Sequence, residues 1–189
     1  ITTIYEGTSE IMEMTIGRDR WQEHLKSRGA FYHDLGADLE KLALAQPNVG
    51  ATAAALAHHA FAEMMEIARV QRLTRNQHVL FRLGELAATV ECAGALARRA
   101  AAAERGELPD KADTRFDAEQ LAAVSRVFAR EAAAKAAYDG LRWVMGASAP
   151  GAVDAAALEN AMALREIEQA QSGLIADMDA VADALYGRG

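Results

Sequence analysis

The sequence has little of several residue types: its 189 residues include one cysteine, three prolines and only 6% aromatics. With Cys92 alone, no disulfide can form inside the chain, and a reducing compartment fits this cysteine usage. No apolar run approaches the ~18 residues of a membrane-spanning helix, and no signal peptide is recognisable. We therefore expect a cytoplasmic protein, with a peripheral membrane location left open.

The chain also has fewer basic than acidic residues. It contains 20 Lys and Arg and 27 Asp and Glu, which give a net charge of −7. Nucleic-acid binding depends on clustered Lys and Arg that contact phosphates, so we expect no nucleic-acid partner. From residue 143 to the end, two basic and seven acidic residues give a balance of −5. Anionic membranes attract basic amphipathic segments, so charge gives membrane association no support.

Alanine is the residue in excess, with 44 copies in the chain. Alanine is the best helix former and a poor strand residue, so the composition excludes an all-β fold and predicts an all-α one. The prolines Pro47, Pro109 and Pro150 fall between helical patterns, where they end one helix before the next begins.

The last predicted helix has the most regular pattern, an a/d seam whose members are alternately three and four residues apart. It consists of Leu164, Ile167, Gln171, Leu174, Met178, Val181 and Leu185. Long helices joined by short loops form antiparallel bundles, so we expect a helical bundle with a shorter N-terminal helical arm. The predicted helices span about 9–26, 30–45, 49–73, 76–105, 117–145 and 154 to the end.

In the helix from Asp117, the large apolar residues are expected to face the core. They are Leu121, Val124, Phe128, Tyr138, Leu141 and Met145.

The segment Tyr5-Glu6-Gly7-Thr8-Ser9-Glu10-Ile11 has two interpretations. In the structural one, Gly7 gives the backbone freedom for a turn, and Thr8 or Ser9 caps the following helix. In the functional one, the free N–H groups at the helix start bind an anion, and a glutamate before the turn acts as a general base.

The letters IYEGTSEI resemble the catalytic signature near the C-terminus of acyl-CoA dehydrogenases, which are flavoenzymes of fatty-acid and amino-acid oxidation. The resemblance implies that Glu6 is the base that removes the α-proton of an acyl-CoA, while the β-hydride passes to FAD and a trans-2-enoyl-CoA forms. It also implies substrate contact at Gly7 and FAD contacts at Thr8, Ser9 and Glu10. The family often has Gln, Asn or Asp at the last position, where Glu10 departs from the pattern.

The resemblance further implies that most of the enzyme lies before this motif and that the chain is a C-terminal part. Residues 1–28 would end the catalytic helical domain, and 29–189 would form an extension like that of very-long-chain and related bacterial members. We expect the chain alone to be inactive, because FAD and acyl-CoA would be held by the parent protein. The family further implies electron-transfer flavoprotein as a partner, and the seam suggests packing or homo-oligomerisation.

Two other classes of function stay open. One is a non-enzymatic helical module for interaction or oligomerisation, in which the motif is coincidental. The other is a dehydrogenase-like protein that binds DNA, against which the net charge of −7 and the intact Glu6 both argue.

Several single residues have simple structural interpretations. His58, His59 and Glu63 have a metal-like spacing, but adjacent histidines point in different directions on a helix, so we expect no metal there. Cys92 is expected to be a buried, inert thiol. Trp21 and Trp143 are expected to anchor helix packing rather than to stack on a ligand.

Overall fold

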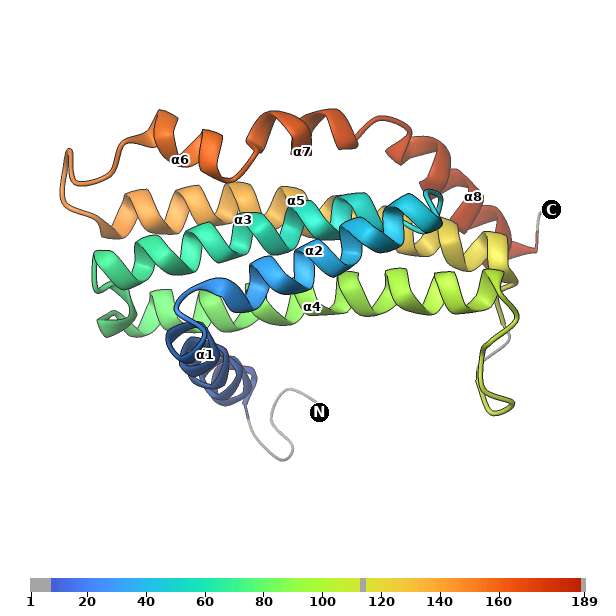
Figure 1. Ribbon diagram of the computed structural model, residues 1–189, viewed down its shortest axis with the longest axis horizontal. Helices are drawn as coiled ribbons and strands as arrows, with labels where there is room; N and C mark the ends of the chain where they lie inside the picture. The colour runs from blue at the N-terminus through green and yellow to red at the C-terminus, as the bar shows by residue number, and fades with distance from the viewer. Residues whose placement is uncertain (1–7, 113–114, 188–189) are drawn as a thin grey trace.

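The computed structural model describes residues 8–112 and 115–187, and within them the fold is an all-helical bundle, which confirms the predicted class (Figure 1). Three long helices, α3, α4 and α5, run through the centre with α4 antiparallel to the other two, and α2 lies along α3. The helices are α1 (Ser9–Lys26), α2 (Ala30–Ala45), α3 (Ala51–Val70), α4 (Gln77–Glu104), α5 (Ala118–Ala147), α6 (Ala155–Ala161), α7 (Leu164–Ala170) and α8 (Leu174–Tyr186), with a 3-10 turn at Leu73–Arg75.

Side-chain caps set the starts of four helices. Thr8 caps α1, Asn76 caps α4, Asp117 caps α5 and Asp154 caps α6, each accepting backbone N–H groups of the first turn. At Asp117 the cap is reciprocal, because the Gln120 side chain accepts the Asp117 N–H in return. The sequence left Thr8 and Ser9 open as the cap of the first helix, and the structure assigns the cap to Thr8.

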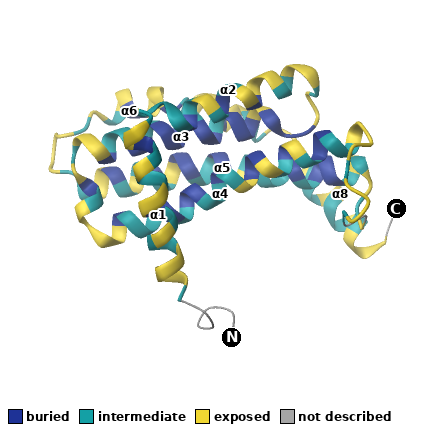
Figure 2. Cartoon of the chain, turned by 60° about the horizontal axis from the view of Figure 1, so that its bottom comes forward, coloured by how far each residue is buried: buried dark blue, intermediate teal, exposed yellow. Residues whose placement is uncertain are grey.

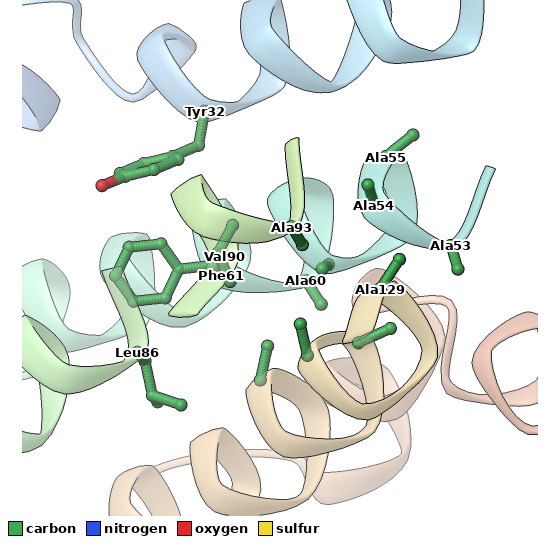
Figure 3. Close-up of a cluster of buried hydrophobic side chains, with 14 of the residues drawn as sticks. Tyr32, Ala53, Ala54, Ala55, Ala60, Phe61, Leu86, Val90, Ala93 and Ala129 are labelled. Carbon is green, nitrogen blue, oxygen red and sulfur yellow. The ribbon is translucent and has the colours of Figure 1, made fainter. Parts of the chain in front are cut away.

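The core is built mainly from alanine, most of it on α3, α4 and α5 (Figures 2 and 3). Larger side chains fill one end, where the rings of Tyr32 and Phe61 meet edge to face with centroids 4.7 Å apart. A methyl side chain allows helix axes to approach closely, so the three long helices pack with little space between them. Fully buried alanines include Ala57, Ala60, Ala87, Ala93, Ala97, Ala129, Ala133, Ala136 and Ala137.

The predicted inward face of α5 is partly wrong. Leu121 is buried, but Tyr138 is 50% exposed and Met145 is 39% exposed. The buried face is instead a stripe of small residues that includes Ala133 and Ala137. The prediction followed the large apolar side chains, whereas close helix packing favours the small ones.

The single long C-terminal helix predicted from the seam is also wrong, because the chain bends twice and forms α6, α7 and α8. Ala163 and Gly173 have left-handed backbone angles, with φ of +52° and +83°, and each interrupts the helix. The three short helices follow the surface of the long ones (Figure 1), so Ile167 becomes fully buried while Leu185 stays 59% exposed. The seam therefore packs largely against α5 of the same chain.

In the part of the chain that the structure describes, every helix is too short or too polar to cross a bilayer.

Candidate functional site

The structure describes only the second half of the motif, from Thr8 onward. Glu6 and Gly7, the predicted base and substrate contact, lie outside the described residues. Thr8 begins them in extended conformation, and its Oγ1 accepts the N–H of Ile11 at 3.4 Å. The predicted helix cap is therefore present at Thr8, with α1 starting at Ser9, and the predicted turn before it lies outside the described residues.

The other two predicted FAD contacts, Ser9 and Glu10, are exposed on the first turn of α1. The Glu10 backbone N–H and the Thr8 hydroxyl hydrogen-bond to the Glu10 carboxylate and lower its pKa. Glu10 is therefore an ionised acid at neutral pH, placed at a helix start where a negative charge is favourable.

The motif helix α1 crosses α4 at a contact made by two glycines. A β-carbon at Gly17 would lie 2.7 Å from the Leu80 carbonyl oxygen, and one at Gly84 would overlap the Glu13 carbonyl. Glycine is thus required on both helices for this separation. The short approach fixes α1 directly on the backbone of α4, and α1 packs far more on α4 than on α2, the next helix in the chain.

Ion pairs hold the same crossing on its two sides. On one side, Arg82 of α4 donates to Glu13 of α1 at 2.8 Å. On the other, Arg20 of α1 donates to Glu91 of α4 at 2.9 Å, and the Tyr32 hydroxyl donates to the same carboxylate at 2.9 Å. Glu91 raises the pKa of Arg20, and burial raises the pKa of Tyr32, so Arg20 stays charged and Tyr32 stays neutral.

A groove of about 350 Å³ runs between α1 and α4 beside the motif. It is mostly apolar, with the bare backbone at Gly84 on one wall and Ser9, Met12 and Ile16 on the other. Ile11 and Met12 are more than half exposed at this end of α1. Sequence reasoning missed the groove, because nothing in the sequence pairs α1 with α4.

His24 near the end of α1 is another feature that the sequence did not reveal. Its side chain is fully buried beside Trp21, with its Nε2 3.2 Å from the Glu66 carboxylate of α3 and no partner for Nδ1 among the described residues. Burial lowers the pKa of His24 despite the nearby glutamate. His24 and Trp21 therefore help to hold α1 against the bundle. Trp21 packs against the buried core, which agrees with its predicted packing role.

The three residues considered for a metal do not come together. His58 is buried and bonded through Nδ1 to the Ala54 carbonyl at 2.7 Å, whereas His59 turns towards α2. Glu63 lies 3.3 Å from His33 of α2. Within residues 8–112 and 115–187, no group of three or more His, Cys, Asp or Glu side chains is arranged to hold a metal ion.

The prediction for Cys92 is wrong, since its side chain is exposed. The buried face of α4 carries Val90, Ala93 and Ala97, and Cys92 lies away from it. Alanine lies on several sides of α4, so the sequence shows no contrast between its buried face and its exposed face.

Comparison of the chain with protein-family models, with curated proteins and with solved structures finds no match.

Proposed function

We propose that this chain is the C-terminal part of an FAD-dependent acyl-CoA dehydrogenase. The observation that carries the proposal is the sequence IYEGTSEI, which leads into a helix capped by Thr8. A helix that begins with a cap at this point of the motif is the local structure that the resemblance implies. The helices from α2 onward would be the extension of the parent enzyme.

In this proposal Glu6 is the base. The α-proton of a thioester is only weakly acidic, so its removal needs a carboxylate held at the reacting carbon in a site that excludes water. The enolate oxygen that forms needs hydrogen-bond donors, and the resemblance assigns the backbone N–H of Glu6 as one of them. When bound, FAD accepts the hydride from the β-carbon.

The described motif residues fit a flavin in part. The Ser9 hydroxyl and the free N–H groups at the start of α1 are donors that suit the polar groups of FAD. Thr8 uses its side-chain oxygen to cap the helix. Glu10 is an ionised, acceptor-only group, so it does not fit a contact with the pyrophosphate. Thr8 and Ser9 are therefore the FAD contacts of this proposal, and Glu10 is a helix-start acid.

The extension has a defined task in this proposal, which is to hold the motif helix. The crossing at Gly17 and Gly84 and the pairs Glu13–Arg82 and Arg20–Glu91 join α1 to α4. Catalysis requires a base held within a few tenths of an ångström of its productive position. Binding of electron-transfer flavoprotein and homo-oligomerisation remain proposals for the parent protein.

The test uses the full-length parent protein. Its visible spectrum is recorded without oxygen while short, medium and long acyl-CoAs are added, and we expect the flavin absorption to bleach with one chain-length class. Glu6→Gln should keep the flavin and lose turnover by at least about a hundredfold, the usual contribution of a general base. Glu10→Gln is the matched control, because it removes a nearby charge and should leave turnover within a few-fold.

A second candidate is a helical interaction module. The observation that favours it is the exposed apolar start of α1 at Ile11 and Met12, which would bind a partner instead of the rest of an enzyme. A colourless parent protein that still shows no bleaching after FAD is added would overturn the dehydrogenase proposal and support this candidate.

A further inference from the structure

The corner where α1 ends and α2 begins closes over the side chain of His24. The imidazole is fully buried, and a β-carbon at Gly29 in the corner would lie 3.7 Å from it. The His24 carbonyl also accepts the Gly29 N–H at 2.8 Å and the Ser27 hydroxyl at 3.2 Å. A change in the charge of this ring therefore acts on the corner that encloses it.

The one hydrogen bond of the ring determines which nitrogen carries the hydrogen. His24 Nε2 bonds to the Glu66 carboxylate of α3 at 3.2 Å. Arg69 donates to both oxygens of that carboxylate, at 2.8 and 2.6 Å, and lowers the pKa of Glu66. Glu66 is therefore ionised at neutral pH and can only accept, so Nε2 carries the hydrogen and Nδ1 is bare in the neutral ring.

A second proton on the ring would have no acceptor. Among the described residues, His24 Nδ1 is buried and has no hydrogen-bond partner. Trp21 stacks on the ring with centroids 5.7 Å apart, and an indole N–H can only donate. Protonation would leave a buried N–H unpaired and place a positive charge away from water, and both effects are unfavourable. Opening the corner relieves both, because water then reaches Nδ1.

We propose that His24 is an acid-sensitive latch: when Nδ1 takes up a proton, the last two turns of α1 and the corner before α2 come away from α3. The first half of α1 stays attached, because its crossing at Gly17 and Gly84 is a contact of uncharged backbone. The helix that begins at the motif therefore has two attachments, and mild acid opens only the one at its far end.

The charged groups around the ring determine the direction of its titration. Burial is the largest effect and lowers the pKa of His24. Glu66 of α3 acts in the opposite direction, whereas Arg69 of α3 and His33 of α2 add to the lowering. A histidine in an unfolded chain titrates near ~6.5. The latch therefore contributes stability above about pH 6.5, and this contribution is lost as pH falls through the lower folded pKa.

Amide exchange measured by mass spectrometry between about pH 7.5 and about pH 5 tests the latch, after correction for the intrinsic pH dependence of exchange. We expect protection of the last two turns of α1 and of the corner to fall about tenfold per pH unit between the unfolded and folded pKa of His24. Protection around Gly17 and along α4 should change much less. NMR of the histidine rings gives the pKa of His24 in the folded chain and in urea.

Two substitutions distinguish the latch from a purely structural contact. His24→Gln cannot gain a proton, so exchange at the corner should lose its pH dependence. Glu66→Gln removes the carboxylate that favours the protonated ring, so the pKa of His24 should fall further and release should begin at lower pH. Glu66 is 41% exposed, so this variant tests the latch even if His24→Gln does not fold.

Glu63→Gln is the matched control on α3, because Glu63 lies beside His33 and should leave the pH of release unchanged. Three outcomes overturn the proposal. One is a pKa of His24 in the folded chain that equals or exceeds its value in urea. Another is wild-type protection at the corner that stays constant over this pH range. The last is a pH dependence that persists in His24→Gln, which would assign it to another group such as the buried His58.

Discussion

Gly84 shows how a single missing side chain positions a helix. Its backbone is in contact with the backbone of α1, and the space for a β-carbon is taken by the Glu13 carbonyl. The obstruction is main chain, which cannot rotate away as a flexible side chain would. Any larger residue at this position must therefore move α1.

We predict that Gly84→Ala destabilises the chain by about 1–3 kcal/mol, the usual cost of overpacking, even though alanine favours a helix by about 1 kcal/mol. Urea unfolding measures the change. Gly146→Ala is the control, and we expect it to stabilise the chain by at most about 1 kcal/mol, because its methyl group enters open space on α5. Equal effects of the two substitutions would contradict the close crossing of α1 and α4.

At the scale of the element, α8 differs from the other helices because none of its described residues is buried. Its attachment depends on Asp177, whose carboxylate accepts from both Arg126 and Arg130 of α5. Arg130 also donates to the carbonyls of Ala170 and Ser172, so one guanidinium holds the end of α7 and the start of α8 together. These polar contacts, called the Asp177 clasp below, therefore add to the partly buried apolar seam of α8.

We predict that Asp177→Asn loosens α8 specifically. Hydrogen bonds to charged groups contribute about 1.5–3 kcal/mol, so amide exchange in α8 should accelerate roughly tenfold to a hundredfold while α4 is unchanged. Asp179→Asn is the control on the same helix, at an exposed position. Exchange mass spectrometry gives the comparison, and equal acceleration in both variants would contradict the clasp.

The same clasp should depend on pH with a definite sign. Arg126, followed by Arg130, lowers the pKa of Asp177 in the folded chain, whereas an unfolded aspartate titrates near ~3.9. The stabilisation is therefore present above about pH 4 and is lost as pH falls through the lower folded pKa. The difference in stability between the wild type and Asp177→Asn should shrink towards pH 2.

At the scale of the whole molecule, the bundle is close-packed because its central residues are small. Ala133 of α5 is fully buried, while its neighbour Ala134 is only partly so. We predict that Ala133→Leu destabilises the chain by about 1–3 kcal/mol and that Ala134→Leu changes it by no more than about 0.5 kcal/mol. Urea unfolding of both variants tests this, and the opposite order would place the packed face of α5 elsewhere.

The sequence predicted the helices well where caps and prolines mark them, as at Thr8, Asn76 and Asp117. It failed at Ala163, because nothing about an alanine in a helical pattern signals a left-handed backbone. It also failed for α5, where buried alanines outrank the large residues Tyr138 and Met145. The contact between His33 and His59 depends on the register of α2 against α3, which the sequence does not give.

The pairing of α1 with α4 has a consequence for the order of folding. Helix α2 packs on α3, α3 on α4 and α4 on α5, but α1 finds its main partner, α4, only after two intervening helices. Contacts that are distant in sequence close larger loops and form later. In a Trp143→Phe background, Trp21 fluorescence should therefore report docking of α1 after far-UV circular dichroism has recovered, and simultaneous recovery would contradict this order. On a ribosome, the residues that follow the motif would be needed before its helix is secured.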